Sequence, residues 1–405
     1  MPTIDWTEDR TARSAAWHAE SAAPPPRRVV VADDRTRAAT AYRLACEGTA
    51  LLWRGDYHNG RRLLQAVARR VDGRTPPPPA DPAAAFHLHR RARGHRARVL
   101  GRLLVLLDGR HTLDLRRAPD VRQACDEAYG PPEGPVAVPL TELLGVVGAH
   151  QWRLKGVEVP ALGARIHPHY GVFSPVRGEY VDLVARAPLP GSPGHAFDLG
   201  TGTGVLAAVL ARRGLGRITA TDASPRALAC ARDNVRRLGL SGRIAVTGPA
   251  LFPGGGGRAG LVVCNPPWLP ARPASGLDRG VYDPDGTMLR DFLAGLAGRL
   301  EPGGEGWLVL SDLAERLGLR TREQLLTLIG AGGLRVTGRL DTRPRHPRAA
   351  DTADPLHAAR AGEVTSLWRL AADPAAASPP PPAHRTGGGD GRGGHGGGQG
   401  QGQQR

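Results

Sequence analysis

The chain has almost no lysine. Lys155 is the single lysine among 54 basic residues (Lys+Arg), and all the others are arginine. Glycine (55 residues) and proline (37 residues) are abundant, and this bias is typical of a GC-rich genome. The formal net charge of +16 is therefore weaker evidence for a nucleic-acid partner than the same charge would be in a chain of ordinary composition.

Cysteine is scarce as well. The four cysteines lie far apart in the sequence, without a C-x-x-C pair and without a histidine at the spacing of a metal ligand: Cys46, Cys125, Cys230 and Cys264. This spacing argues against a disulfide framework and against a zinc site. We expect buried or inert thiols in a reducing compartment, and we expect no metal.

Long hydrophobic runs are also missing. No apolar run approaches the roughly 20 residues that a membrane span requires. The N-terminus carries Asp5, Glu8 and Asp9 and lacks the apolar core of a signal peptide. We therefore expect a cytoplasmic protein without a membrane partner.

The most informative segment that is present has the form D-x-G-x-G-x-G. An apolar run leads to Asp198, and glycine then occupies every second position, at Gly200, Gly202 and Gly204. This pattern predicts a buried strand that ends in a tight turn and opens a helix over residues 205–213. Glycine lets the backbone of such a turn bend sharply and approach a ligand closely.

The spacing of this segment bears on the type of ligand. A dinucleotide fingerprint is G-x-G-x-x-G, whereas this turn lacks the x-x step and has an acid two residues before its first glycine. A carboxylate there would repel a pyrophosphate but suits the cationic methionyl end of S-adenosyl-L-methionine. A second predicted strand, 217–220, leads to Asp222, where a doubly wound sheet places a carboxylate on ribose hydroxyls. Taken alone, the turn is also compatible with a plain strand-to-helix connection.

A second motif, Asn265-Pro266-Pro267-Trp268, follows the apolar strand predicted over 260–264. Ligands of open α/β sheets bind at the carboxyl ends of strands. The prolines remove two donors and leave carbonyls free, so Asn265 and Pro266 can accept both hydrogens of a planar –NH2 group. Trp268 offers a flat face for stacking. Transfer to such a nitrogen depends mainly on positioning and needs no metal. The alternative is an ordinary turn with a core aromatic.

With these residues, the region from about 165 to 370 resembles the class I S-adenosylmethionine-dependent methyltransferases of the "methyltransferase small domain" family. That family includes protein-glutamine N5 methyltransferases and ribosomal-RNA guanine-N2 methyltransferases. The resemblance extends to the segments 171–175 and 227–234 and covers about half of the chain. It implies an α/β fold with a Rossmann-like, seven-stranded methyltransferase sheet.

The resemblance also implies residue roles. Asp222, with Ala223 beside it, would hold the ribose, and the loop 265–268 would grip the acceptor nitrogen, with Asn265 also near the cofactor. Relatives usually carry an acid at the position of Ala250, where it can accept from the adenine amino group, so we expect modest cofactor affinity. The methionyl part would lie in a cradle formed by Asp198, Gly200, Thr201, Gly202, Thr203 and Gly204.

Composition and patterning predict four parts of the chain: a flexible N-terminus (1–27), an α/β accessory domain (28–151), the methyltransferase domain (152–370) and a disordered Pro/Gly/Gln-rich tail (371–405). Within the accessory domain, the segment 51–60 resembles a strand followed by a degenerate cofactor turn, so this domain is either a decayed duplicate or an unrelated α/β fold. We expect a helix over 36–46, a strand over 50–53, a helix over 60–71, a Pro-rich loop over 75–82 and an apolar strand or helix over 99–107.

The sequence thus predicts an S-adenosylmethionine-dependent N-methyltransferase whose substrate is a protein glutamine or an RNA base of the translation machinery. One alternative is an adenine-N6 nucleic-acid methyltransferase, and another is a catalytically inactive scaffold that binds the cofactor. Two arginine clusters, 89–98 and 343–348, could contact phosphates or could be solvated faces.

Overall fold

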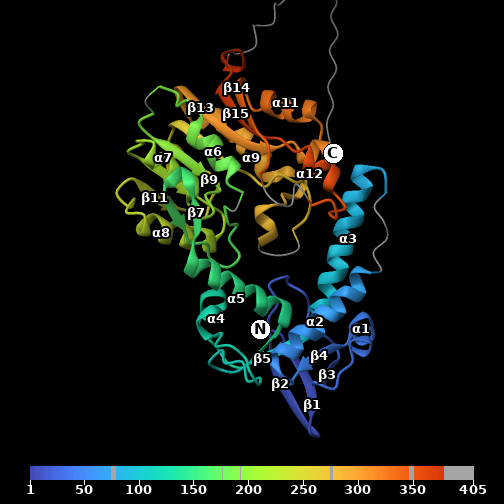
Figure 1. Cartoon of the computed structure of the whole chain (residues 1–405). Coiled ribbons are helices and arrows are strands. Elements are labelled where there is room, and N and C mark those ends of the chain that lie inside the picture. Colours follow the sequence, from blue (N-terminus) through green and yellow to red (C-terminus); the bar gives the residue numbers. More distant parts are fainter. Residues whose placement is uncertain (74–78, 176, 192, 274–276, 346–350, 378–405) are drawn as a thin grey trace, which may run out of the picture.

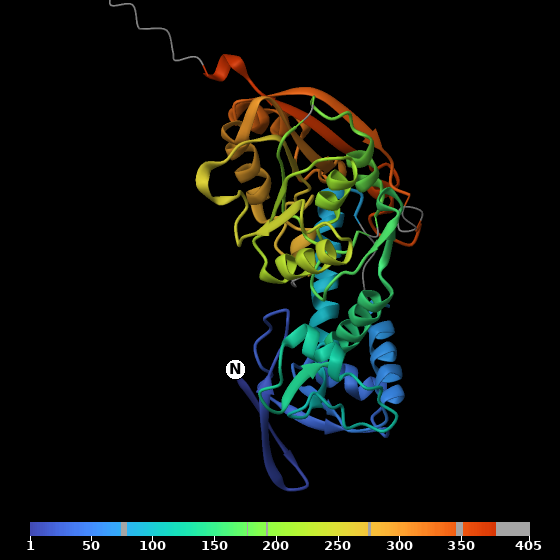
Figure 2. The same ribbon diagram turned by 90° about the vertical axis from the view of Figure 1, so that its left-hand side faces the viewer.

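The computed structural model describes residues 1–73, 79–175, 177–191, 193–273, 277–345 and 351–377. Each half of the chain forms one large β-sheet, and the two sheets lie one above the other (Figures 1 and 2). Two helices, α3 (Pro82–Leu100) and α5 (Leu140–Lys155), run between the halves (Figure 1). None of the described helices combines the length and the apolar character needed to cross a membrane.

The C-terminal half contains a seven-stranded sheet with the order β11-β10-β9-β12-β13-β15-β14. The first five strands in this order are parallel, and β15 runs antiparallel to both of its neighbours. The order reverses at β9, and the predicted Rossmann-like, seven-stranded fold is confirmed. The strands are β9 (Ala196–Leu199), β10 (Ile218–Thr221), β11 (Ile244–Thr247), β12 (Ala259–Cys264), β13 (Leu300–Ser311), β14 (Leu334–Thr342) and β15 (Thr365–Ala372).

Helices cover both faces of this sheet, and every residue of its central strands β9 and β12 is buried. Leu261 and Val263 of β12 pack in the core with α6 (Glu179–Arg186) and α7 (Val205–Arg212). Val262 and Cys264 point the other way, into the core with α9 (Thr287–Leu296) and α11 (Arg322–Ala331). The remaining elements of this half are α8 (Pro225–Arg237), α10 (Leu313–Arg316), α12 (His357–Ala361) and the small hairpin of β7 (Val157–Val159) and β8 (Ala164–Ile166).

The N-terminal half contains a six-stranded sheet with the order β1-β2-β6-β5-β4-β3. Strands β3, β4 and β5 are parallel, and β6 is antiparallel to β5. Its strands are β1 (Thr3–Glu8), β2 (Thr11–Trp17), β3 (Val29–Ala32), β4 (Ala50–Trp53), β5 (Leu103–Leu107) and β6 (Val136–Pro139). Its helices, besides α3 and α5, are α1 (Ala38–Cys46), α2 (Tyr57–Asp72) and α4 (Arg122–Tyr129).

The expectation of a flexible N-terminus over residues 1–27 is wrong. Strands β1 and β2 form an antiparallel hairpin at the edge of the six-stranded sheet. Ile4 and Trp6 are buried from β1, and Ala15 and Trp17 are buried from β2. This alternation of apolar and polar residues is the mark of a half-buried strand, although polar and small residues dominate the segment.

Helix α3 was not expected from the sequence. The segment contains many arginines and shows no clear apolar stripe, so only the Pro-rich loop before it and the arginine cluster within it were recognised. Its beginning is nevertheless well defined, because Asp81 accepts a hydrogen bond from the Ala84 N–H at 2.8 Å and Pro82 occupies the first turn. Alanine and arginine, both good helix formers, fill most of its length.

The segment that resembled a degenerate cofactor turn follows β4. A Cβ added to Gly55 would lie 2.6 Å from the Trp53 ring and 2.7 Å from Asp34, so these two side chains pack closely against the turn. Asp56 caps α2 and pairs with Arg117. The strand order does not reverse at β4, unlike at β9, and this topology favours an unrelated α/β fold over a decayed duplicate.

The C-terminal end of the described chain is ordered slightly beyond the expected boundary at residue 370. Strand β15 extends to Ala372, and a 3-10 turn follows at Pro374–Ala377. Most of the tail predicted to be disordered, 378–405, lies outside the described residues.

Candidate functional site

Three neighbouring strands end in register and bring the predicted site residues together. Leu199 at the end of β9 pairs with Thr221 of β10 on one side and with Cys264 of β12 on the other. The next residues along the chain are Gly200, Asp222 and Asn265. Since adjacent strands lie about 4.8 Å apart, these three positions form a row along the carboxyl edge of the sheet, where its strand order reverses.

The glycine turn has the backbone conformation that its sequence predicts. Gly200, Gly202 and Gly204 have φ values of +69°, +55° and +82°, in the left-handed region. A Cβ added to Gly202 would meet nothing within 4 Å, so the backbone at this point borders open space. At Gly204 the added atom would lie 3.4 Å from Ala231, which shows that this glycine serves the packing of α7 against α8.

Asp198 belongs to β9, and its buried side chain contacts the turn that follows the strand. Its Oδ2 accepts hydrogen bonds from the Thr201 hydroxyl at 2.6 Å and from the Ala207 N–H at 3.0 Å, so the carboxylate caps the beginning of α7. Burial raises the pKa of Asp198 to about 6, although these two hydrogen bonds oppose the rise. The side chain therefore holds the turn, and it can act on a cationic ligand through its charge alone.

Asp222 is half-buried and held by backbone amides. Its Oδ2 accepts from the Gly202 N–H at 3.0 Å, and its Oδ1 accepts from the Ser224 N–H at 2.8 Å. Burial raises its pKa, while hydrogen bonds from Ser224, Gly202 and the exposed Ala223 favour the charged form. A carboxylate fixed in this way keeps further lone pairs for two neighbouring hydroxyl groups.

Ala250 occupies the position expected for an acid in relatives. It is exposed, and its N–H donates to the backbone carbonyl of Asp222 at 3.2 Å. Leu251 and Phe252, which follow it, are half-buried. A base bound next to Asp222 would therefore meet backbone and apolar side chains at this position, not a carboxylate.

The Asn-Pro-Pro-Trp loop differs in one respect from its expected form. The Trp268 Nε1–H donates to the Asn265 Oδ1 at 2.9 Å, and the indole is half-buried against the cores on both faces of the sheet. The Arg177 guanidinium lies 5.0 Å from the centre of the Trp268 ring. Trp268 is thus not an open stacking face. It orients the Asn265 amide, whose oxygen keeps a second lone pair for another donor.

Arg177 and its partners were missed by the sequence analysis. Arg177 donates to Glu179 at 2.8 Å and to Glu363 at 3.0 Å, and Glu363 also accepts from the Ser311 hydroxyl at 2.6 Å. Both glutamates are buried, so these contacts fix the guanidinium beside Trp268. Arg177 closely follows the recognised segment 171–175, which is a local signal, but no sequence pattern links it to Glu363.

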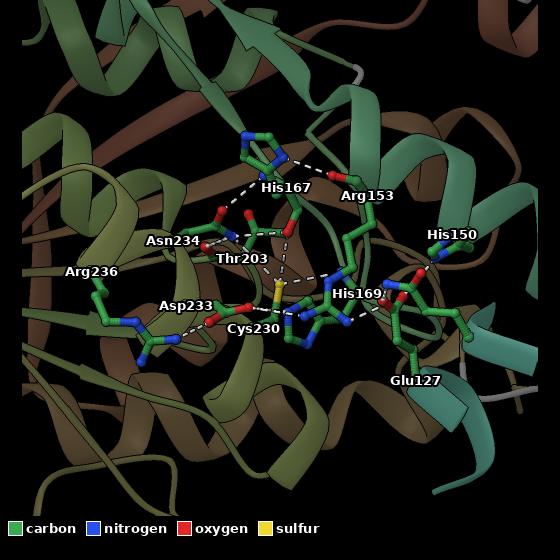
Figure 3. A network of polar contacts seen from close by, with 11 residues as sticks. Glu127, His150, Arg153, His167, His169, Thr203, Cys230, Asp233, Asn234 and Arg236 are labelled. Atoms are coloured by element: carbon green, nitrogen blue, oxygen red, sulfur yellow. Dashed lines mark hydrogen bonds and ion pairs between the residues drawn. The ribbon is translucent and has the colours of Figure 1, made fainter. Parts of the chain in front are cut away.

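A polar network contacts the glycine turn from the side of α8 (Figure 3). The Asn234 Nδ2 donates to the Thr203 carbonyl at 3.0 Å, and its Oδ1 accepts from the His167 N–H at 2.8 Å. Beside it on α8, the Asp233 carboxylate contacts both Arg153 of α5 and His169 at 3.0 Å. The network therefore joins the turn to a helix that comes from the N-terminal half.

Among the described residues, no group of three or more His, Cys, Asp or Glu side chains is arranged to hold a metal ion. The row instead presents three groups to a ligand: a curved backbone at Gly202, a fixed carboxylate at Asp222 and an amide oxygen at Asn265. These groups suit a ligand with vicinal hydroxyls on one side and an –NH2 group on the other.

Residues 164–319 match the family model described as "Methyltransferase small domain". The release factor glutamine methyltransferase of Moorella thermoacetica is 36% identical over 149 residues, which are 32% of this chain and 53% of that protein. The ribosomal RNA small subunit methyltransferase C of Alcanivorax borkumensis is 37% identical over 119 residues, which are 29% of this chain and 33% of that protein. The chain thus spans about half or less of the length of these relatives.

Solved structures with a similar arrangement include the ribosomal protein L11 methylase from Lactobacillus delbrueckii subsp. bulgaricus. The likeness covers 49% of this chain and 78% of that chain, with 17% sequence identity and a TM-score of 0.34.

Proposed function

We propose that this chain, whose residues 164–319 match the model of the methyltransferase small domain, transfers a methyl group from S-adenosyl-L-methionine to a planar amino or amide nitrogen. The acceptor belongs to a protein glutamine or to a base in RNA. Relatives act, by their names, on a release factor and on ribosomal RNA. Since we propose a substrate in the translation machinery, we expect the activity in the cytoplasm.

The residues of the row fit this cofactor. Gly202 leaves open space that a side chain would fill, and its N–H fixes the Asp222 carboxylate in position for the ribose hydroxyls. The buried Asp198 adds negative charge behind the turn, which favours the cationic methionyl end. When bound, the cofactor supplies the methyl group in an electrophilic form. Ala250 offers the base no carboxylate, so we expect modest affinity.

The acceptor loop orients the nitrogen that receives the methyl group. The free lone pair of the Asn265 Oδ1 and the Pro266 carbonyl can accept the two hydrogens of an –NH2 group, which turns the nitrogen lone pair toward the glycine turn. As the nitrogen acquires positive charge, both contacts become stronger, and this stabilises the transition state. Trp268, held beside Arg177, keeps the Asn265 amide in this orientation.

The observation that carries the proposal is the register of the three strands, which sets Asp222, Gly200 and Asn265 side by side. An inactive scaffold would need the first two positions alone. The intact Asn265 therefore favours an enzyme, and Ala250 is the one observation that favours the scaffold.

The test uses the full chain with methyl-labelled cofactor and a lysate that contains ribosomes and release factors. We expect label in macromolecules with the wild type and at least a hundredfold less with Asn265→Ala. Label removed by protease identifies a protein acceptor, and label removed by ribonuclease identifies RNA. Label in DNA would support an adenine-N6 nucleic-acid methyltransferase instead, and no transfer despite bound cofactor would support the scaffold.

A further inference from the structure

Helices α2 and α3 carry a strong excess of positive charge. Together they contain nine arginines and a single carboxylate, that of Asp72. Arg96 of α3 binds this carboxylate at 2.8 Å, so no acid on the two helices remains for the other arginines. In the whole chain the ratio is far lower, at 54 basic to 38 acidic residues. Genomic bias toward arginine therefore does not account for this surface.

Three of these arginines are exposed on the outer faces of the two helices: Arg62, Arg91 and Arg98. Arg91 and Arg98 lie seven residues apart on α3 and share one face with His87 and His95, because two helical turns separate the first pair. Arg62 is exposed on α2. Among the residues that the structure describes, none of these three arginines forms an ion pair.

Arginines elsewhere in the chain are used differently. Arg54 binds Glu8, Arg226 binds Glu20 and Arg369 binds Glu305, each through two hydrogen bonds between side chains. The molecule thus neutralises many arginines within the fold but leaves the outer face of α2 and α3 uncompensated. Such a surface needs a polyanionic partner or solvent counterions.

The opposite face of α3 touches the segment that follows the acceptor loop. Phe86 is buried in a cluster with Leu269, which is the residue after Trp268. Arg90 stacks on Tyr282, with its guanidinium 3.8 Å from the ring centre, and also donates to the Arg272 carbonyl. The helix therefore connects the basic surface to the segment that follows the acceptor loop, and Figure 1 shows it running from α2 up to the C-terminal half.

From this arrangement we infer that the outer faces of α2 and α3 bind the phosphate backbone of an RNA substrate, and that the acceptor nitrogen belongs to an RNA base. The inference rests on the proposed methyltransferase function. Helix α3 is about 28 Å long, which gives its arginines room to contact several consecutive phosphates. Bidentate guanidinium contacts to phosphate suit a chain that uses arginine in place of lysine.

The test compares two triple variants that remove the same charge. The first, R62Q/R91Q/R98Q, alters the basic surface. The control, R212Q/R237Q/R335Q, alters three exposed arginines of the C-terminal half that form no ion pair or side-chain hydrogen bond with other described residues. Arg212 and Arg237 end α7 and α8, at the edge of the sheet opposite the candidate site. Binding of a short fluorescent RNA is measured by anisotropy over a series of salt concentrations, and folding is checked by thermal melting.

We expect the first variant to bind RNA at least tenfold more weakly at about 0.1 M salt, with a salt slope smaller by about two, because each phosphate contact contributes about 0.7 to the slope for a single strand. The control should bind within twofold of the wild type. Both variants should bind S-adenosylhomocysteine normally. An equal loss in both variants would reduce the effect to net charge and overturn the inference.

The labelling experiment separates this inference from the function on which it rests. Ribonuclease-sensitive label that falls with R62Q/R91Q/R98Q supports both. Protease-sensitive label that is unchanged in this variant overturns the RNA surface and leaves the methyltransferase intact. Specific RNA binding without any methyl transfer supports the surface and contradicts the proposed function.

Discussion

At the scale of single residues, the contact between Trp268 and Asn265 changes the role that we assign to Trp268 in the acceptor motif. The indole N–H occupies one lone pair of the Asn265 oxygen at 2.9 Å, and the ring lies against Arg177. A stacking platform would need only an aromatic face, whereas an orienting group needs the N–H as well. The two roles predict different outcomes when the ring is kept and the N–H is removed.

We expect Trp268→Phe to lower kcat by about three- to tenfold, which corresponds to the loss of one neutral hydrogen bond of about 0.5–1.5 kcal/mol. Cofactor affinity should not change. Asn265→Ala should lower kcat by a hundredfold or more, since it removes the contact to the acceptor itself. Steady-state kinetics on the acceptor that the labelling identifies checks both. Full activity in Trp268→Phe would instead support a role for Trp268 as a stacking surface.

Sequence reasoning found the row of Gly200, Asp222 and Asn265 because each stands directly after an apolar run, and the ends of parallel strands meet at one edge. It could not find the partners of Arg177. Glu363 lies 186 residues away, and the two meet only because β15 inserts beside β13. Contacts of this kind depend on the packed fold and leave no local pattern.

At the scale of elements, the glycine turn after β9 has two requirements: a left-handed backbone at Gly202 and, in our proposal, open space beside it for the cofactor. Mutation can separate these two requirements. Gly202 and Gly239 have similar backbones, with φ of +55° and +69°, and an added Cβ meets nothing within 4 Å at either position. A side chain at either site costs a similar conformational strain of about 1–2 kcal/mol. Gly202 alone borders the proposed cofactor space.

We therefore expect Gly202→Asp to abolish measurable binding of S-adenosylhomocysteine and Gly239→Asp to bind it as the wild type does. Both variants should lose a similar amount of stability. Calorimetric titration and thermal melting of the two proteins decide the matter. A Gly202→Asp protein that is folded and binds normally would show that the turn is only a strand-to-helix connection.

Element prediction succeeded where a pattern was local and simple. The strand predicted over 260–264 and the helix predicted from residue 205 match β12 and α7 within one residue. Helix α3 was missed because its arginines surround it, so no apolar stripe marks its buried side. Phe86 of this helix is buried against the C-terminal half of the chain, and a contact so distant in sequence leaves no local pattern.

At the scale of the whole molecule, the two halves are joined by more than the connecting chain. Phe86 of α3 is 1% exposed and packs with Leu313 and Leu317 of the C-terminal half. On the other side, Arg226 of α8 donates to Glu20 and to the Ala128 carbonyl of the N-terminal half. Junctions of this kind couple the unfolding of two sheets, because separating them exposes apolar surface and unpaired charge.

We expect the wild type to unfold in a single calorimetric transition and Phe86→Ala to unfold in two, with the N-terminal half melting first. The matched control is Phe292→Ala, which removes an equally buried ring from the core of the seven-stranded sheet. Each change should cost about 3–5 kcal/mol, but only Phe86 bridges the halves. Differential scanning calorimetry of the three proteins tests this. A single transition in Phe86→Ala, shifted as far as that of Phe292→Ala, would mean that the coupling resides in α5 and the Arg226 contacts.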